Sequence, residues 1–375
     1  MKTNLPLHVS VQYLVCVGLL ACGGVAKSDW QLGPFTRPID RPVIAPRAET
    51  VFSCPMLGRD IHWESSDTFN PAAVVYQDQI YVLYRAEDGT GDGIGKHTSR
   101  LGLAKSPDGI TFERLPVPVF YPDNDSAKPY EWRGGCEDPR IVEGPDGVFY
   151  MHYTMWNRDN PDGTPRAARI GAASSKDLVR WTKHGPIFKN AANGRFLNDW
   201  HKAAAVVTKI DRGRLVAAKI NGKFWMYWGE ASIHAAVSND LIHWEPVLDE
   251  KGNLRTLIRP RKDKFDSLLT EAGPPAVVTD KGIVLIYNGK NSGADKTLAA
   301  GAYAAGQLLL DAEDPLRVVE RGDACFFRPE RDFEKTGQYK DGTVFAEGLV
   351  YFKGTWFLYY GTADSFVGVA SCKNP

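Results

Sequence analysis

Alternation of apolar and polar residues recurs along this chain in five segments that are rich in aromatic side chains. The segments are Tyr81–Asp88, Phe149–Asn157, Lys223–Glu230, Ile283–Gly289 and Trp356–Gly361. Aromatic and β-branched residues that alternate with a period of two are typical of β-strands. A shorter apolar segment precedes each one, and a turn such as Pro145-Asp146-Gly147 joins the two. The pattern therefore predicts five β-hairpins.

Two more strands follow most of these hairpins, in the same order each time. A strand of small residues leads through a Ser-x-Asp turn to an aromatic residue, as in Leu103–Phe112, Ala172–Trp181 and Ala235–Trp244. Successive hairpins begin roughly seventy residues apart. Four strands repeated five times predict an all-β fold, a five-bladed β-propeller that forms one domain over residues 46–375. A two-domain sandwich would not repeat the same internal order five times.

Composition supports this fold and excludes some partners. The 375 residues include 36 Gly and 24 Pro, which favour short strands and turns over long helices. The 45 Lys and Arg residues balance 45 Asp and Glu residues, so the formal net charge is zero. A nucleic-acid-binding domain carries a basic excess, and a membrane-surface protein a polybasic segment. We therefore expect no nucleic-acid partner and no electrostatic binding to membranes.

The amino terminus resembles an export signal. The apolar run Tyr13–Ala21 is too short to span a bilayer and suits a secretory signal, which predicts a signal peptide over residues 1–21. Leu19–Cys22 resembles a bacterial lipobox, in which Cys22 would be lipidated, whereas Gly24–Ala26 offers a site for ordinary signal peptidase. Residues 22–45 are then a linker. We expect a protein of the bacterial periplasm or cell surface, attached to the membrane only through this possible lipid.

No metal or cofactor motif is present in the sequence. The eight histidines form no H-E-x-x-H pair, and no C-x-x-C occurs, so we expect neither a catalytic metal nor a cofactor. Besides Cys22, the mature chain retains Cys54, Cys136, Cys325 and Cys372. Export permits disulfides, so these residues are either buried thiols or form one bridge, with three pairings possible.

Polar residues begin the first strand of each predicted unit and end the second. Because the first strands of a propeller line its central channel, these strand ends meet at one mouth of the channel. The residues placed there are Asn70, Arg85, Glu87, Asp88, Asp138, Trp156, Asn157, Lys202, Glu230, Glu271, Asn288, Glu347 and Asp364. Carboxylates and amides bind hydroxyl groups, and an indole face stacks on a pyranose. The pattern predicts a sugar-binding pocket on the axis.

Three of these carboxylates, Asp138, Glu230 and Glu271, come from adjacent units. Glycoside cleavage uses two carboxyl groups, one to protonate the leaving oxygen and one to activate water or form a covalent intermediate. Carboxyls on different blades can stand far enough apart to admit a water molecule between them. This placement predicts an inverting glycosidase.

Five short motifs resemble glycoside hydrolase family 130 from about Phe69 to the C-terminus. They are Tyr84–Asp88, Gly134–Ile141, Tyr227–Glu230, Glu271–Pro275 and Phe345–Leu349. The resemblance implies a five-bladed propeller and activity as a β-mannoside phosphorylase or β-mannosidase. It also implies that Asp138 is the general acid, which in the phosphorylases acts through a substrate hydroxyl.

One departure from the family pattern bears on the choice between phosphate and water. The phosphorylases typically carry Tyr-His-Gly, whose His helps to hold phosphate, where this chain has Tyr287-Asn288-Gly289. The chain is therefore more similar to the exported hydrolytic branch, which acts on β-1,2-mannosides and whose two water-activating glutamates match Glu230 and Glu271. Lys202, Arg140 and Arg169 remain as possible phosphate ligands.

The leading hypothesis is an inverting, exo-acting β-mannosidase, with Asp138 as the acid and Glu230 or Glu271 as the base. Asn70, Arg85, Asp88, Arg140, Lys202, Asn288, Glu347 and Asp364 would bind the substrate, and Trp156 would stack on it. Three alternatives stay open: a mannoside phosphorylase, another five-bladed glycosidase such as one acting on arabinan, and a glycan-binding surface lipoprotein without catalysis.

Overall fold

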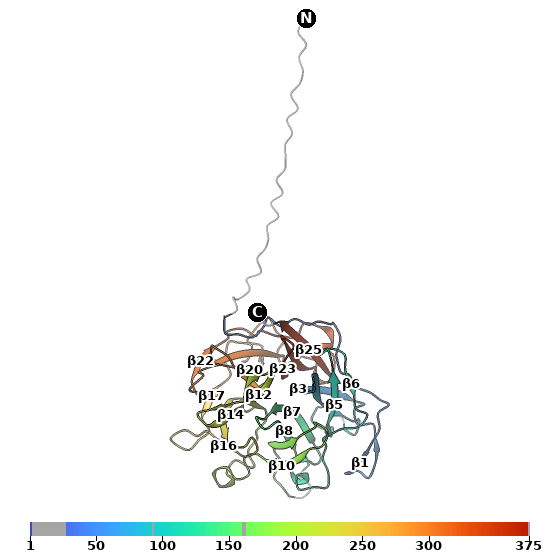
Figure 1. Cartoon of the computed structure of the whole chain (residues 1–375). Helices are drawn as coiled ribbons and strands as arrows, with labels where there is room; N and C mark the ends of the chain where they lie inside the picture. Colours follow the sequence, from blue (N-terminus) through green and yellow to red (C-terminus); the bar gives the residue numbers. More distant parts are fainter. Residues whose placement is uncertain (2–27, 92–93, 160–162, 374–375) are drawn as a thin grey trace.

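The structure is a computed structural model that describes Met1 and residues 28–91, 94–159 and 163–373 (Figure 1). Cys22 and, apart from Met1, the predicted signal peptide lie outside the described residues. Strands dominate the fold, which confirms the predicted all-β class. Helical segments in the described ranges are short: α1 (Lys128–Glu131), η1 (Ala191–Gly194) and η2 (Asp332–Glu334). None of the described helices is long and apolar enough to cross a membrane.

The strands form five successive antiparallel units. Unit 1 comprises β3 (Asp67–Tyr76), β4 (Gln79–Glu87), β5 (Ser99–Ser106) and β6 (Glu113–Arg114). Unit 2 comprises β7 (Gly135–Glu143), β8 (Phe149–Trp156), β9 (Ala168–Ser175) and β10 (Thr182–Pro186). A separate hairpin of β1 (Phe52–Cys54) and β2 (Arg59–Ile61) precedes unit 1.

The last three units follow the same plan with more interruptions. Unit 3 comprises β11 (Ala204–Asp211), β12 (Arg214–Ala217), β13 (Lys219–Ile220), β14 (Lys223–Trp228), β15 (Ile233–Ser238), β16 (Trp244–Pro246) and β17 (Thr256–Ile258). Unit 4 comprises β18 (Leu269–Ala272), β19 (Ala276–Val278), β20 (Ile283–Lys290), β21 (Tyr303–Leu310) and β22 (Val318–Arg321). Unit 5 comprises β23 (Val344–Phe352), β24 (Thr355–Thr362) and β25 (Phe366–Lys373).

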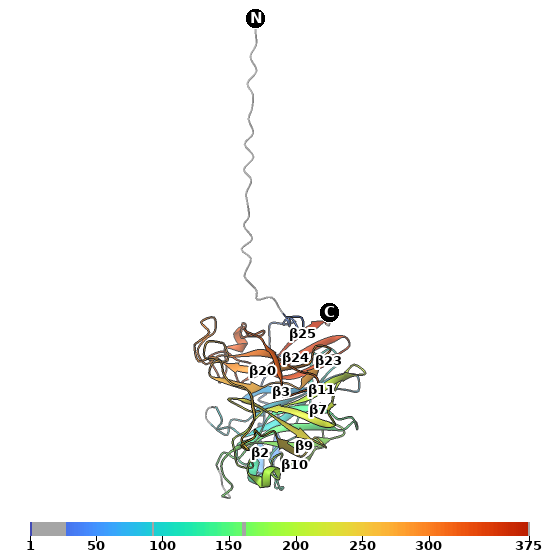
Figure 2. The same ribbon diagram turned by 90° about the vertical axis from the view of Figure 1, so that its left-hand side faces the viewer.

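The opening strands of the units gather in the middle of the molecule. Figures 1 and 2 both place β3, β7 and β23 near the centre, whereas the late strand β10 lies toward the edge. Parallel pairings join neighbouring units, as between Ser99 of β5 and Gly135 of β7 and between β11 and β19. This arrangement is consistent with the predicted five-bladed propeller.

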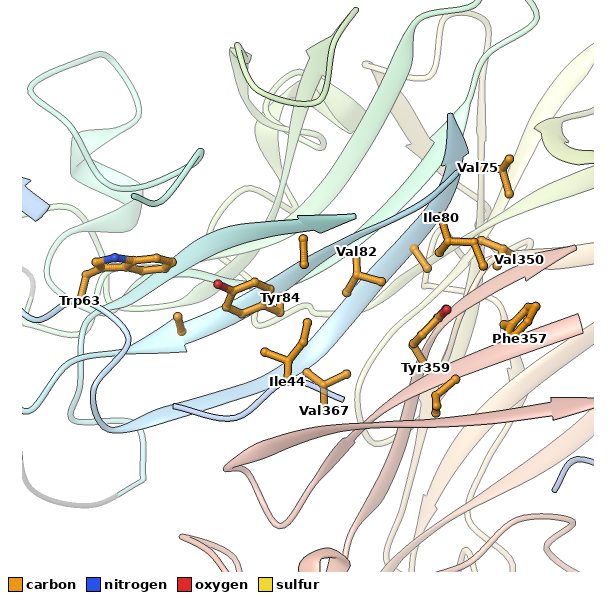
Figure 3. Close-up of a cluster of buried hydrophobic side chains, with 14 of the residues drawn as sticks. Ile44, Trp63, Val75, Ile80, Val82, Tyr84, Val350, Phe357, Tyr359 and Val367 are labelled. Carbon is orange, nitrogen blue, oxygen red and sulfur yellow. The ribbon is translucent and has the colours of Figure 1, made fainter. Parts of the chain in front are cut away.

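Each pair of neighbouring units shares an apolar cluster. Separate clusters join units 1 and 2, units 2 and 3, units 3 and 4, and units 4 and 5. A fifth cluster joins unit 1 to unit 5, where Val82 and Tyr84 pack with Tyr359 and Val367 (Figure 3). Fully burying one such side chain contributes about 1.5–3 kcal/mol, so these contacts hold the first unit against the last.

Part of the segment predicted as a linker packs on unit 5. Thr36 pairs with Ser371 and Ile44 with Val367, which adds a strand-like edge to β25. Phe35 is buried in the same region. This edge stands where the other units have a fourth strand, so both ends of the domain contribute to unit 5.

Cys54, Cys136 and Cys325 have free thiols. Cys54 and Cys136 are buried. For these two residues the prediction of buried thiols, and not that of a disulfide, is confirmed. Cys136 packs in the cluster between units 1 and 2. Burial raises the pKa of the Cys136 thiol well above its usual range, so this residue behaves as an apolar core side chain.

Irregularities interrupt the opening strands near the predicted mouth. The register shifts between Phe69 and Pro71 in β3 and between Glu137 and Arg140 in β7. Asn70 and Asp138, at these two shifts, have left-handed φ angles of 44° and 47°. A bulge re-aims the extra side chain away from the sheet face. At these distortions the two polar side chains line the cavity described below.

Candidate active site

A cavity of about 340 Å³ opens at the ends of the central strands. Eight predicted residues line it: Asn70, Arg85, Asp138, Trp156, Lys202, Glu230, Glu271 and Asp364. They come from all five units or from the segments that join them. The volume suits a sugar-sized ligand, and the lining combines charged groups with aromatic faces.

Two predicted binding residues are committed to structural bonds and are not among the lining residues. Asp88 accepts a hydrogen bond from Arg100 at 2.7 Å, and both side chains are buried. Asn288 donates to the carbonyl of Ala346 at 3.0 Å and accepts from its N–H at 2.8 Å. The strand-end pattern placed both residues near the mouth, but Asp88 pairs with the side chain of Arg100 and Asn288 bonds the backbone of Ala346 instead.

Arg140 and Glu347 also lie outside the lining, packed against each other. Arg140 donates to the carbonyl of Ala272 at 3.1 Å and to that of Asp138 at 3.0 Å. One Glu347 oxygen lies 3.4 Å from the Arg140 guanidinium, and burial raises the pKa of Glu347 well above its usual range. Arg140 thus holds the backbone that carries Asp138. The sequence pattern could not distinguish residues that lie behind the cavity wall from residues that line the cavity.

The lining also includes residues to which the sequence predictions gave no catalytic or binding role. They are Phe69, Glu87, Ile94, Gly95, Glu137, Trp200, Lys290, Tyr303, Gln338, Tyr339, Thr343 and Phe345. Glu87 and Glu137 stand in the quoted motifs beside predicted residues, so the motifs carried a signal for them. Trp200 and Gln338 lie on irregular segments, where no periodicity marks a position.

Arg85 is the centre of an ion-pair network on the cavity wall. Its guanidinium lies 2.6 Å from Glu87, 3.0 Å from Glu137 and 3.0 Å from Asp138. Lys202 lies 3.2 Å from Glu137 and 3.7 Å from Asp138. Three carboxylates and two cations therefore fix one another in a buried wall, which limits their freedom to move when a ligand enters.

Asp138 is held as a carboxylate. Asn70 donates to its Oδ1 at 2.8 Å, on the same oxygen that Arg85 contacts. Burial by itself would raise the pKa of Asp138. The charges of Arg85 and Lys202 outweigh burial and hold that pKa well below its usual range. Asp138 is therefore ionised at neutral pH in this cavity.

Glu230 and Glu271 form a second carboxyl pair. Burial and the negative charge of Glu230 raise the pKa of Glu271 to about 8. Glu271 is therefore protonated at neutral pH. Trp200 donates its indole N–H to Oε2 of Glu230 at 2.5 Å. The Glu230 side chain is thus oriented by an indole at the cavity mouth.

Asp364 also holds a proton near neutral pH. Burial raises the pKa of Asp364 to about 7, against the charge of Arg85, and the charge of Asp138 adds to the rise. Its carbonyl accepts a hydrogen bond from Gln338 at 3.1 Å, and the same amide reaches Glu87 at 3.2 Å. The cavity therefore contains two carboxyls, Glu271 and Asp364, that can supply protons.

One group of side chains could hold a cation beside the cavity. Asp67, Glu87 and His97 are buried, and each offers a ligand atom within 4.8 Å of the others. Asp67 accepts hydrogen bonds from Ser66 at 2.5 Å and Ser365 at 2.6 Å, while Arg85 already pairs with Glu87. Neutral donors and Arg85 thus satisfy much of this group.

The family model described as beta-1,4-mannooligosaccharide phosphorylase, glycoside hydrolase family 130, matches residues 47–374. A curated 1,2-beta-oligomannan phosphorylase from Thermoanaerobacter sp. (strain X514) is 34% identical over 333 residues, covering 88% of this chain and 94% of the relative.

Solved structures are more similar still. A putative glycosidase from Bacteroides thetaiotaomicron VPI-5482 is 54% identical with a TM-score of 0.89, covering 92% of this chain and 98% of that one. A structure described as "The GH130 family of mannoside phosphorylases contains glycoside hydrolases that target beta-1,2 mannosidic linkages in Candida mannan" is 52% identical. Its TM-score is 0.89, and the match covers 93% of this chain and 98% of that one.

Proposed function

The chain belongs to glycoside hydrolase family 130, and from this premise we propose that it hydrolyses β-1,2-mannosides with inversion, releasing mannose from a chain end. The observation that favours water over phosphate as the nucleophile is that the Arg and Lys side chains near the cavity already have protein partners. Backbone carbonyls and carboxylates already bind nearly all of these side chains, and Glu230 and Glu271 lie in the same cavity.

The three cations that the sequence left as possible phosphate ligands are occupied by protein groups. Arg169 donates to the carbonyls of Leu197 at 2.8 Å and Pro165 at 2.6 Å, and is not among the lining residues. The donors of Arg140 reach backbone carbonyls, and Lys202 pairs with Glu137 and Asp138. A phosphate ion would have to compete with these bonds and approach Glu230, which favours a neutral water nucleophile.

In the proposed reaction Glu230 is the base. Glu271 holds its proton at neutral pH, because burial and the negative charge of Glu230 raise its pKa. Glu230 would take a proton from water as the water oxygen attacks the anomeric carbon. Glu271 would donate a hydrogen bond to the same water or to the sugar. This assigns different tasks to two residues that sequence alone could not separate.

Asp138 keeps its proposed task at the leaving oxygen, reached through a sugar hydroxyl. Because Asp138 is ionised in the free cavity, the proton that it passes on must first be supplied. We propose Asp364 as the source, since its pKa of about 7 leaves it partly protonated near neutral pH. Substrate entry also removes water from Asp138, which favours its protonated form.

A phosphorylase is the second candidate, and one observation favours it. Lys290 lines the cavity, and no carboxylate in the described part of the chain lies within ion-pair distance of it. Its ammonium group lies 5.1 Å from the ring centre of Tyr303 and 5.2 Å from that of Tyr339. This cation could bind an anion, and the curated relative named above is a phosphorylase.

We also propose that the five units close as a five-bladed propeller. The support is the set of five apolar clusters, one for each pair of neighbouring units, including the pair of unit 1 and unit 5. In such a ring the cavity lies at one mouth of the axis. An experimental structure in which units 1 and 5 stand apart would contradict this.

Export and lipid attachment at Cys22 remain a proposal that rests on the sequence. Expression of the full chain in a bacterium should place it in the membrane fraction. Cys22→Ser should release it, because a single lipid anchor would be the only attachment. A wild-type protein that fractionates as soluble would favour the ordinary signal-peptidase site instead.

Product analysis with β-1,2-mannobiose, with and without phosphate, tests the proposed function. We expect mannose as the only product and the same rate in both buffers. Turnover that needs phosphate and yields mannose 1-phosphate would establish the phosphorylase. Binding without any product would favour a glycan-binding protein.

A further inference from the structure

We propose that Trp200 has two tasks in this cavity: its indole ring forms the stacking surface for the leaving sugar, and its N–H positions Glu230 to take a proton from the attacking water. The proposal rests on the proposed function, whose substrate is a β-linked mannoside. Trp200 carries no strand periodicity, and the sequence predictions did not include it.

The exposure of Trp200 contrasts with the fixed backbone around it. The side chain is 54% exposed at the cavity mouth. Its chain neighbour His201 is buried, donates its N–H to the carbonyl of Ala168 at 3.0 Å and accepts from the N–H of Ile170 at 3.0 Å. A large apolar ring on a rigid segment is what a stacking surface requires, because little conformational entropy is lost on binding.

The other side of the segment is equally fixed. Arg169 donates to the carbonyl of Leu197 at 2.8 Å and to the amide oxygen of Asn198 at 2.8 Å. Phe196 is buried in the cluster between units 2 and 3. Hydrogen bonds thus hold the backbone on both sides of Trp200, although the segment is neither helix nor strand.

A second indole supports the ring of Trp200. Trp156 is only 6% exposed, and its ring lies edge-to-face with that of Trp200 at a centroid distance of 5.3 Å. The Arg166 guanidinium lies 5.0 Å from the Trp156 ring centre. Trp156, proposed from sequence as the stacking residue, is therefore mostly covered, and Trp200 presents the accessible face. The apolar face of a mannose ring can pack on such a surface.

The indole N–H of Trp200 also orients the proposed base. It donates to Oε2 of Glu230 at 2.5 Å. An indole N–H can only donate, so it holds this carboxylate oxygen as an acceptor. The other oxygen of Glu230 is then left to accept a proton from water. A sugar stacked on the Trp200 ring would therefore rest on the group that aims the base.

Two substitutions separate the tasks. Trp200→Phe keeps an aromatic face and removes the N–H, whereas Trp200→Ala removes both. Trp225→Phe is the matched control, because Trp225 also donates its indole N–H, to the carbonyl of Ile220 at 3.1 Å, and is not among the residues that line the cavity. The substrates are β-1,2-mannobiose and 4-nitrophenyl β-mannoside.

We expect Trp200→Phe to lower kcat about 10- to 100-fold on both substrates, with KM changed about threefold or less, because a hydrogen bond to a charged group is lost. The acidic limb of its kcat profile should move to higher pH, since the base loses a donor that favours its charged form. A merely structural role would not move this limb. Trp200→Ala should in addition raise KM for mannobiose about tenfold or more, and Trp225→Phe should behave as wild type.

Unchanged kcat and pH profile in Trp200→Phe would overturn the positioning task. Unchanged KM in Trp200→Ala would overturn the stacking task. If the wild type releases no mannose, the proposed function fails, and tryptophan fluorescence titration with mannobiose still decides the stacking task. In that case weaker binding by Trp200→Ala than by wild type supports it, and equal binding overturns it.

Discussion

Asp138 shows how much of a residue's chemistry depends on neighbours that are distant in sequence. Its partner Asn70 comes from unit 1, as does Arg85, and Lys202 precedes unit 3. The strand-end pattern placed these four residues at one mouth, and all four line one cavity. The pattern could not predict that Asp138 is ionised while Glu271 is protonated, because protonation depends on distances between charges on separate strands.

Replacing Asp138 tests its role at the leaving oxygen. Asp138→Asn should lower kcat on mannobiose by a factor of about 10²–10⁴, because the amide cannot pass on a proton. The variant should fold, since an amide retains hydrogen bonding to Asn70. Activity above about a tenth of wild type, measured on protein with an unchanged thermal transition, would argue against this role.

Glu271→Gln should stabilise the protein at alkaline pH while reducing activity. In the folded state the pKa of Glu271 is about 8, above its ordinary value of 4.5. Between these values the unfolded chain releases a proton that the folded chain retains, so the free energy of unfolding falls as pH rises. Glutamine does not titrate and removes this loss. The resulting gain in the free energy of unfolding over wild type has an upper bound of roughly 4–5 kcal/mol at pH 8 and is almost zero near pH 4.5.

Thermal unfolding at several pH values checks this prediction. The advantage of Glu271→Gln over wild type should grow from pH 5 to pH 8. Glu113→Gln, at a side chain that is 77% exposed, is the control and should show no such trend. A constant or shrinking advantage would mean that Glu271 is not protonated in the folded state.

At the scale of the strand, the sequence predicted elements better than their distortions. Alternation and turn residues located the aromatic strands of all five units. Asn70 and Asp138 were predicted to open the first strands of units 1 and 2, but β3 and β7 begin three residues earlier, at Asp67 and Gly135. The pattern did not predict the bulges at those two positions, because a bulge is defined by its register against a partner strand. Trp200 and Gln338 were missed because irregular segments have no period.

The bulge at Asn70 depends on a glycine in unit 5. A Cβ added at Gly361 would lie 2.1 Å from Oδ1 of Asn70. Gly361→Ala should therefore displace Asn70 from Asp138 and lower kcat/KM about tenfold or more. Gly89→Ala is the control, since a Cβ there would have no neighbour within 4 Å. Equal activity of both variants would show that Asn70 does not need its present position.

The packing of residues 36–44 against unit 5 should contribute to the stability of the fold. Arg37 lies 2.6 Å from the fully buried Glu334, and its removal would leave that charge unpaired. Arg37→Ala should lower the free energy of unfolding by about 3–5 kcal/mol in a denaturant titration. Arg331→Ala should cost about 1 kcal/mol or less, because its ion pair with Asp40 is exposed. Equal effects would argue against this anchoring role.

At the scale of the whole molecule, repetition made the architecture predictable. Five units in one internal order led from sequence to an all-β fold with a polar site among the central strands. The contact of unit 5 with residues 36–44 could not be predicted, because that segment lacks alternation and its partner strand lies at the other end of the chain. Family membership then points to mannosides as substrates, and the cavity has a volume that suits a sugar-sized ligand.

One NMR time course shows directly whether water or phosphate is the nucleophile. Proton and phosphorus spectra would follow β-1,2-mannobiose with wild-type protein in buffer containing phosphate. We predict that α-mannose appears first from the released residue, before it equilibrates, and that no sugar phosphate forms. Accumulation of α-mannose 1-phosphate, with no reaction once phosphate is removed, would show that phosphate is the nucleophile and that the protein is not a hydrolase.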